Sequence, residues 1–216
     1  MAPEKGAHRI VFLGPPGSGK GTQARLLMSQ FGLEHISTGA MLRSEIESGT
    51  PLGLQAQGYI ENGQLAPDQL VRTLAEKALK THDCQQFILD GYPRTVQQAI
   101  WLCEFMDSRS ITISAAVNFI IDREEVVARL SQRRINYRTG ENFHLSDKPP
   151  PQDQSEYIIT RKDDQPDAIR KRLNIYHERT HPLVDYYSDK KLLVPVDAKA
   201  SFTEVNEQIC NLLKLE

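Results

Sequence analysis

The feature that constrains this chain most is a glycine-rich stretch, GPPGSGKGT, at residues 14–22. An apolar run at residues 9–13 precedes it directly, and a helical pattern follows it. Glycines allow the backbone to wrap its N–H groups around phosphate oxygens without Cβ clashes, and the N-terminus of the following helix adds positive potential. Lys20 can then reach the β and γ phosphates of a nucleotide. A simple glycine-rich turn gives no reason for a lysine between apolar flanks, so we predict a phosphate-binding loop (P-loop).

Short apolar runs alternate with helical patterns along the chain. The runs lack strict polar alternation, as strands buried on both faces of a parallel sheet do. They lie at residues 9–13, 87–89, 115–121 and 192–196. The helical patterns lie at residues 19–31, 38–48, 68–80, 95–106, 123–133, 166–187 and 201–213. We therefore predict an α/β fold, a doubly wound parallel sheet of the P-loop type flanked by helices, with ligands beyond the carboxyl ends of the strands.

Two stretches interrupt this alternation. Residues 37–66 are helical and punctuated by glycines, which predicts a small helical insert. Residues 132–164 form a long connection between two arginine-bearing helices, and a connection of this length in a compact domain is usually a lid or a disordered loop. The core domain then comprises residues 1–36, 67–131 and 165–216.

Composition places the chain among globular proteins and excludes several classes of partner. With 216 residues, 39% of them hydrophobic and 25% charged, the chain fits one core with small insertions. A formal net charge of -2 gives no overall attraction to nucleic acid or anionic lipid. We therefore expect no nucleic-acid partner and no membrane partner, and nothing in the sequence demands more than a monomer.

The cysteines and the start of the chain bear on its compartment. Cys84, Cys103 and Cys210 are far apart and lack C-x-x-C spacing, which indicates neither a disulfide framework nor a zinc knuckle. The start is polar, and no run reaches the roughly 18 apolar residues that suggest a transmembrane helix. We expect a cytoplasmic protein, with organellar import by an internal signal as the open alternative.

One detail narrows the class of phosphate loop. The general pattern has Ser or Thr directly after the lysine, whereas here Gly21 intervenes before Thr22. Nucleoside monophosphate kinases carry this GKGT form, and the chain lacks the N-K-x-D sequence that reads guanine. Through GPPGSGKGTQ, HISTGAMLR, FILDGYPRT, the Q-R-R segment and TRKDD, the chain resembles the adenylate kinase family over essentially its whole length.

The resemblance implies reversible transfer of the terminal phosphoryl group of Mg-ATP to AMP, which gives two ADP. The attacking phosphate oxygen is already ionised, so this reaction requires alignment and charge neutralisation and no general base. The stretch 37–66 would be the insert that binds the nucleoside monophosphate, and 132–164 a lid that excludes water.

The resemblance also assigns residues to the AMP site. Gln98 and Thr38 would read the adenine, which favours AMP over UMP or CMP, and Arg43 and Arg94 would grip its phosphate. The residues implied for AMP binding are Thr38, Gly39, Arg43, Gln64, Leu65, Ala66, Gly91, Tyr92, Pro93, Arg94, Gln98, Arg161 and Arg172.

A second set is implied for ATP. Its members are Gly17, Ser18, Gly19, Lys20, Gly21, Thr22, Arg129, Arg133, Asn142, Phe143, His144, Ala198 and Lys199. The implied catalytic residues are Lys20, Arg94, Arg133, Arg161 and Arg172. Asp163 and Asp164 would orient the lid arginines by paired hydrogen bonds. Thr22 and Asp90 would hold Mg²⁺, largely through water, as few protein ligands and several waters suit this ion.

Two departures from the family pattern stand out. Ala40 replaces an aspartate that helps to hold the water shell of the metal, so we expect weaker Mg²⁺ dependence or lower turnover. The lid has Asn136 and Thr139 where some members have zinc cysteines, so we expect no zinc.

Two alternatives stay open. The first is a nucleotide-sensing binding protein with weak turnover through Ala40. The second is a related kinase that uses GTP as donor or another monophosphate as acceptor.

Overall fold

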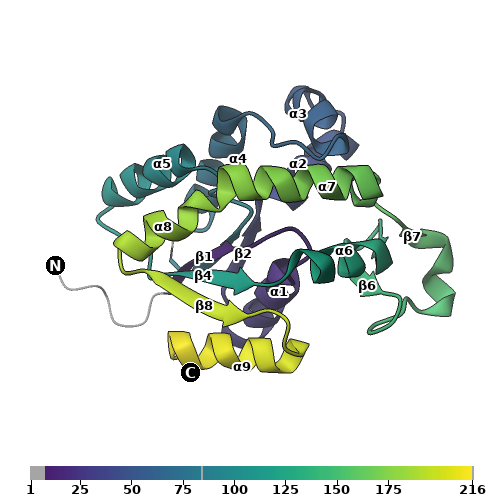
Figure 1. The fold of residues 1–216 in the computed structure, drawn as a ribbon. Coiled ribbons are helices and arrows are strands. Elements are labelled where there is room, and N and C mark those ends of the chain that lie inside the picture. The colour runs from purple at the N-terminus through teal and green to yellow at the C-terminus, as the bar shows by residue number, and fades with distance from the viewer. Residues whose placement is uncertain (1–7, 84, 216) are drawn as a thin grey trace.

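A parallel sheet forms the centre of the molecule (Figure 1). The computed structural model describes residues 8–83 and 85–215, and within them the sheet has five strands in the order β2-β3-β1-β4-β8. Their bounds are β1 Arg9–Leu13, β2 Glu34–Ser37, β3 Phe87–Asp90, β4 Ala115–Ile120 and β8 Leu193–Asp197. Every pairing in this sheet is parallel, which confirms the predicted fold class.

Helices cover both faces of the sheet. Alternate side chains of one strand point to opposite faces, so Val11 and Leu13 join one buried cluster while Ile10 and Phe12 join the other. The first cluster includes side chains from α4, α5 and α8, and the second includes side chains from α1 and α9, which Figure 1 shows below the sheet. The helices are α1 Lys20–Phe31, α2 Thr38–Glu47, α3 Pro51–Glu61, α4 Asp68–Thr81, α5 Val96–Asp107, α6 Arg123–Gln132, α7 Pro166–Ile175, α8 Pro182–Asp189 and α9 Phe202–Leu213.

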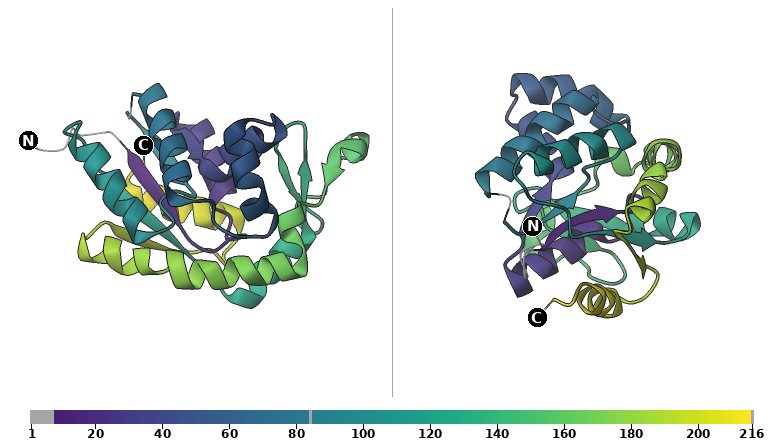
Figure 2. Two further views of the ribbon diagram at one scale, coloured as in Figure 1. Left: turned by 90° about the horizontal axis from the view of Figure 1, so that it is seen from above. Right: turned by 90° about the vertical axis from the view of Figure 1, so that its left-hand side faces the viewer.

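The two interrupting stretches have different structures. Residues 37–66 contain α2 and α3. Residues 132–164 contain an antiparallel sheet of strand order β6-β5-β7, which projects at one end of the molecule (Figure 2). Its strands are β5 Arg133–Asn136, β6 Asn142–His144 and β7 Ile158–Ile159. One 3-10 turn, Gln152–Tyr157, precedes β7, and another, Lys162–Asp164, follows it.

Three elements differ from the sequence prediction. Strand β2 is not among the apolar runs of the sequence, because it lies at the edge of the sheet and buries only Ile36. The helix expected at 123–133 ends at Gln132, and Arg133 opens strand β5. The helix expected at 166–187 is interrupted by a π-helical turn at Tyr176–Thr180, after which Pro182 opens α8. Proline lacks an N–H group and suits the first turn of a new helix.

Among the described residues, no helix combines the length and the apolar character that crossing a bilayer requires.

Candidate active site

A cavity of about 1470 Å³ lies at the carboxyl ends of β1 and β3, where the fold predicts a ligand. It is lined by the glycine-rich loop, by both inserts, by α7 and by the segment between β8 and α9. The residues of the expected site that line it are Gly17, Ser18, Gly19, Lys20, Gly21, Thr22, Thr38, Gly39, Arg43, Gln64, Leu65, Ala66, Asp90, Gly91, Pro93, Arg94, Gln98, Arg129, Arg133, Asn142, Phe143, His144, Arg161, Asp163, Arg172, Ala198 and Lys199. The structure does not bring Tyr92 to the cavity wall, because its ring is buried in the core and its hydroxyl donates to the Gln98 carbonyl.

The glycine-rich loop is folded around the ammonium group of Lys20. The Lys20 Nζ donates to the carbonyls of Gly14 at 2.8 Å and Pro15 at 2.7 Å, and to Ser18 Oγ at 3.1 Å. Gly17 has a φ of 81°, and a Cβ on it would meet Leu130 Cγ at 2.8 Å, so both backbone and space require glycine there. Burial lowers the pKa of Lys20 to about 8. The loop therefore presents a buried cation at the N-terminus of α1, which favours anions.

Two guanidinium groups converge above Gly39. A Cβ on Gly39 would lie 3.5 Å from Arg43 Nη1 and 3.8 Å from Arg94 Nη2, so the missing side chain leaves them room. Burial lowers the pKa of both arginines, and the charge of Arg172 lowers that of Arg94 further. Within residues 8–83 and 85–215, neither arginine forms an ion pair with a carboxylate. Positive charge that is buried and unneutralised is suited to an incoming phosphate.

The backbone of Arg94 is held by side chains from two helices. Its N–H donates to Gln98 Oε1 at 2.7 Å, and its carbonyl accepts from Thr180 Oγ1 at 2.9 Å. The Gln98 amide also donates to Asp68 Oδ1 at 2.8 Å, and the side chain is almost inaccessible. The resemblance implies that Gln98 reads the adenine; in this structure Gln98 lines the cavity, and both polar groups of its side chain have protein partners.

Two further arginines of the cavity, Arg133 and Arg172, are held by carboxylates. Arg133 makes a two-pronged contact with Asp164, whose side chain is inaccessible to solvent. Arg172 Nη1 donates to the same carboxylate at 3.0 Å and lies 3.1 Å from Asp163 Oδ2. Burial would raise the pKa of Asp163, but Arg172 and the neighbouring arginines outweigh it and lower that pKa. Two buried carboxylates thus fix the positions of two arginines, as paired hydrogen bonds of this kind can.

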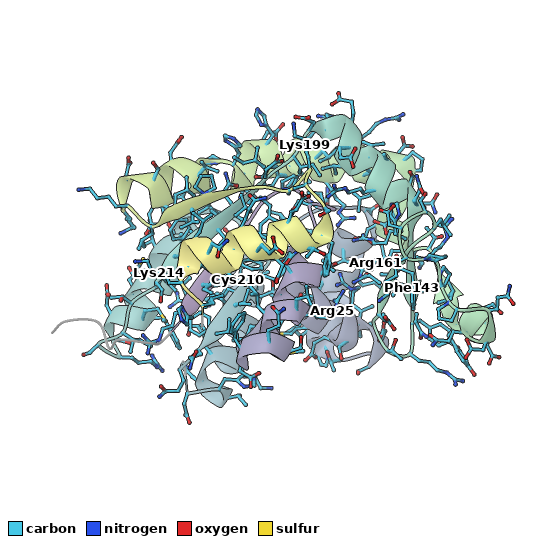
Figure 3. All side chains as sticks on the ribbon, turned by 90° about the horizontal axis from the view of Figure 1, so that it is seen from below. Arg25, Phe143, Arg161, Lys199, Cys210 and Lys214 are labelled. Atoms are coloured by element: carbon cyan, nitrogen blue, oxygen red, sulfur yellow. The ribbon has the colours of Figure 1, made fainter. Side chains whose placement is uncertain are left out.

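Arg161 is held differently. Its Nη2 lies 3.5 Å from Asn142 Oδ1, and among the described residues it has no carboxylate partner. Burial and the charges of Arg43 and Arg133 lower its pKa. Figure 3 labels Arg161 together with Phe143, which comes from β6 and also lines the cavity. Six of the cations that line the cavity come from six separate segments of the chain: Lys20, Arg43, Arg94, Arg133, Arg161 and Arg172.

The opposite end of the cavity is walled by the segment between β8 and α9. Arg129 Nη1 donates to the Ala198 carbonyl at 2.9 Å, and Gln23 Nε2 donates to the Phe202 carbonyl at 2.8 Å. On the lid side, His144 Nδ1 lies 3.2 Å from Asp147 Oδ2, and its Nε2 has no hydrogen-bond partner among the described residues.

Several lining residues were not part of the sequence prediction, among them Gln23, His35, Tyr176, Thr180 and Phe202. Gln23 stands in the GPPGSGKGTQ motif, so its position was available as a signal. Thr180 lies in no motif that we recognised, and only the folded chain brings it to the site.

Asp90 and Thr22 fit the surroundings of a magnesium ion. Asp90 ends β3, and a Cβ on Gly21 would lie 3.2 Å from its Oδ2, which places the carboxylate against the first turn of α1. Burial raises the pKa of Asp90, but the bond to His35 Nε2 at 3.4 Å and the charge of Lys20 outweigh it and lower the pKa. The ionised carboxylate can accept hydrogen bonds from metal-bound water. Within the described residues, no group of three or more His, Cys, Asp or Glu side chains could hold a metal ion.

Comparison with known proteins agrees with this geometry. The family model described as adenylate kinase matches residues 12–192. The adenylate kinase of Salinibacter ruber is 46% identical over 198 residues, which cover 91% of this chain and 93% of that protein. The adenylate kinase of Chloroherpeton thalassium is 42% identical over 95% of this chain and 97% of its own length, and that of Clostridium perfringens (strain SM101) is 39% identical over 95% and 98%. The chain belongs to the adenylate kinase family and is an ATP:AMP phosphotransferase.

Proposed function

We propose that this ATP:AMP phosphotransferase divides its cavity into two ends, with Mg-ATP along the glycine-rich loop and AMP over Gly39. The observation that carries the proposal is the convergence of six buried or half-buried cations from six segments of the chain. Two polyanions must approach each other in the reaction, and their mutual repulsion requires positive charge on every side. A solvated arginine face would not explain this convergence, because such side chains usually extend toward water.

At the acceptor end, Arg43 and Arg94 would bind the AMP phosphate. Both lack carboxylate partners among the described residues, so their charge is free for the ligand. Gln64, Leu65 and Ala66 would lie along the base, since they line the same cavity. The attacking oxygen of AMP is ionised, and the arginines therefore need only align it and neutralise its charge.

At the donor end, Lys20 would exchange its bonds to the loop carbonyls for phosphate oxygens. Arg129 and the segment of Ala198 and Lys199 would flank the adenine of ATP. Arg133, Arg161 and Arg172 would surround the phosphoryl group in transfer, with Asp163 and Asp164 keeping two of them in place.

Asp90 and Thr22 would hold Mg²⁺, mainly through its water shell. The bound ion supplies charge neutralisation on the phosphate oxygens and orients them. The protein contributes an ionised carboxylate, that of Asp90, beside the start of α1. Lowering of the Asp90 pKa by His35 and Lys20 keeps that carboxylate charged at neutral pH.

The domain division belongs to the same proposal. Residues 1–36, 67–131 and 165–216 would form the core, 37–66 the AMP-binding insert, and 132–164 a lid that closes over ATP and excludes water. We also propose a monomer that works in the cytoplasm without a nucleic-acid or membrane partner.

A coupled assay tests the substrate assignment. ATP is supplied with AMP, UMP, CMP or GMP, and GTP is supplied with AMP. We expect efficient turnover only for ATP with AMP. Faster turnover with another monophosphate would identify that monophosphate as the acceptor, and faster turnover with GTP would identify GTP as the donor. Binding of both nucleotides without turnover would indicate a nucleotide sensor.

A further inference from the structure

The π-helical turn between α7 and α8 changes which side chain faces the cavity. The His181 N–H donates to the Tyr176 carbonyl at 2.8 Å, five residues earlier, where an α-helix would bond to the fourth. The widened turn shifts every later residue around the helix axis. Thr180 is consequently buried and lines the cavity, while the preceding Glu178 and Arg179 are exposed. Turns of this kind occur frequently at functional sites.

The Thr180 hydroxyl donates to the Arg94 carbonyl at 2.9 Å. On the other side of the same residue, Gln98 accepts from the Arg94 N–H at 2.7 Å. The Arg94 Nε donates to the Gly91 carbonyl at 3.0 Å. Side chains from two separate helical segments thus hold both backbone polar groups of Arg94, and its guanidinium is tied to the turn before it.

Arg94 needs such anchors more than Arg133 and Arg172 do. Arg133 and Arg172 are oriented by buried carboxylates, whereas Arg94 has no carboxylate partner among the described residues. A carboxylate beside Arg94 would fix its position but would also neutralise the charge that an acceptor phosphate requires. Neutral groups that hold the backbone give a fixed position without that loss.

We propose that Thr180 is a positioning residue for the acceptor phosphate, which acts by holding the backbone of Arg94 and is presented by the π-helical turn. The inference rests on the proposed function, in which Arg94 binds the AMP phosphate. The simpler alternative is that the hydroxyl only satisfies a buried carbonyl and contributes to stability alone.

The test compares Thr180→Val, which replaces the hydroxyl by a methyl group of similar size, with Thr180→Ser, which keeps the hydroxyl. The dissociation constant of AMP in the absence of ATP, both KM values, kcat and the melting temperature are measured. A hydrogen bond is worth about 1 kcal/mol, so we expect Thr180→Val to weaken AMP binding about fivefold and to lower kcat. The KM for ATP should stay within about twofold, and Thr180→Ser should stay within about twofold of the parent throughout. Thr180→Ala is measured as well, because it removes the hydroxyl without placing a methyl group against the carbonyl.

Arg94→Ala closes a double-mutant cycle with Thr180→Val. If Thr180 acts through Arg94, its replacement should change AMP affinity by less than about twofold once Arg94 is absent. A lower melting temperature with unchanged AMP binding in both hydroxyl-free variants would overturn the inference, and so would equal losses for AMP and ATP. Unchanged AMP binding in Arg94→Ala would overturn the role of Arg94 in the proposed function as well, which separates the two failures.

Discussion

Four arginines of the cavity fall into two groups at the scale of single residues. Arg133 and Arg172 are paired with Asp163 and Asp164, so their positions are fixed and their charge is partly neutralised. Arg43 and Arg94 have no such partner among the described residues. The paired arginines are suited to holding a phosphoryl group at one point, and the unpaired ones to attracting and binding a second phosphate.

The variant Ala40→Asp tests whether position 40 affects the binding of Mg²⁺. Ala40 lines the cavity, and its N–H donates to Ser37 Oγ at the start of α2. Ala40→Asp would add an acceptor for metal-bound water, an effect typically worth about 10- to 100-fold in metal affinity or activity. We expect the Mg²⁺ concentration for half-maximal rate to fall while the AMP affinity stays nearly unchanged.

A titration of Mg²⁺ at saturating ATP and AMP measures this effect. Ala128→Asp, on the exposed side of α6, controls for the added charge and should match the parent protein. Superimposable curves for Ala40→Asp and the parent would mean that position 40 lies outside the reach of the metal and that Asp90 serves it alone.

At the scale of elements, the 3-10 turn Lys162–Asp164 connects the lid region with its neighbours. Asp164 bridges Arg133 at the start of β5 and Arg172 on α7. Lys162 Nζ lies 2.8 Å from Glu61 Oε1 at the end of α3, although this pair is exposed and contributes little. A Cβ on Gly63 would meet the Ala168 carbonyl at 3.0 Å, so the helical insert of residues 37–66 packs closely on α7. The buried carboxylate is therefore the principal electrostatic link of this junction.

Asp164→Asn should damage both stability and rate. It keeps the shape but removes the buried charge between two arginines, and breaking a buried pair costs about 3–5 kcal/mol. We expect a melting temperature lower by several degrees or more and a clear fall in kcat, since Arg133 and Arg172 lose their fixed positions. Asp167→Asn is the matched control, because Asp167 pairs with Arg170 on the same helix but is 88% exposed. Equal behaviour of the two variants would contradict a special role for Asp164.

The proposed lid, residues 132–164, is held by hydrogen bonds at Asn136, a position where some members of the family have a zinc cysteine. Asn136 Oδ1 accepts from the N–H groups of Arg138 and Thr139, and its Nδ2 donates to Gln154 Oε1 at 2.9 Å. The Arg138 guanidinium also stacks 3.8 Å above the Tyr157 ring. These contacts join β5 to the segment before β7 without a metal ligand.

We expect that purified protein contains no stoichiometric zinc and that a chelator leaves its melting temperature unchanged. Elemental analysis measures the zinc content, and thermal scans with and without the chelator measure the melting temperature. The free Mg²⁺ concentration is kept the same in both scans. About one zinc ion per chain, or a chelator-dependent fall in melting temperature, would show that a metal holds the lid after all.

For the whole molecule, the distribution of charge matters more than its sum. The chain carries a formal net charge of -2, yet ten lysine and arginine side chains line one cavity. A cleft with low-dielectric walls focuses such a field on an anionic ligand, whereas the outer surface repels further anions weakly. This arrangement explains how a slightly acidic protein can bind two nucleotides.

Ionic strength should therefore affect substrate binding more than folding. Between about 0.05 M and 0.5 M salt, the Debye length falls from roughly 14 Å to roughly 4 Å. We expect the KM values for ATP and AMP to rise severalfold with added potassium chloride at a fixed free Mg²⁺ concentration, while the melting temperature changes little. Substrate constants that do not depend on salt would contradict electrostatic attraction by the cavity.

Several features of this protein could be predicted from its sequence. The fold class and the phosphate loop depend on local signals: buried apolar runs, helix periodicity and the glycines around Lys20. The family followed from motifs that keep their order along the chain. Strand β2 was missed because an edge strand with one buried side chain has almost no apolar signal.

Other features depend on contacts between distant residues and were decided only by the folded chain. Gln98, which the resemblance assigns to the adenine, lines the cavity, and its amide also meets the Arg94 backbone and Asp68, thirty positions away in the sequence. The single helix expected at 166–187 is interrupted by a π-helical turn. Thr180, at the end of this turn, contacts Arg94, eighty-six positions away, and local periodicity does not indicate such a contact. Sequence by itself determined which chemical groups the site contains, since those are set by short motifs. The tertiary structure decided which of them hold each other, because a hydrogen bond depends on distances that only the completed packing establishes.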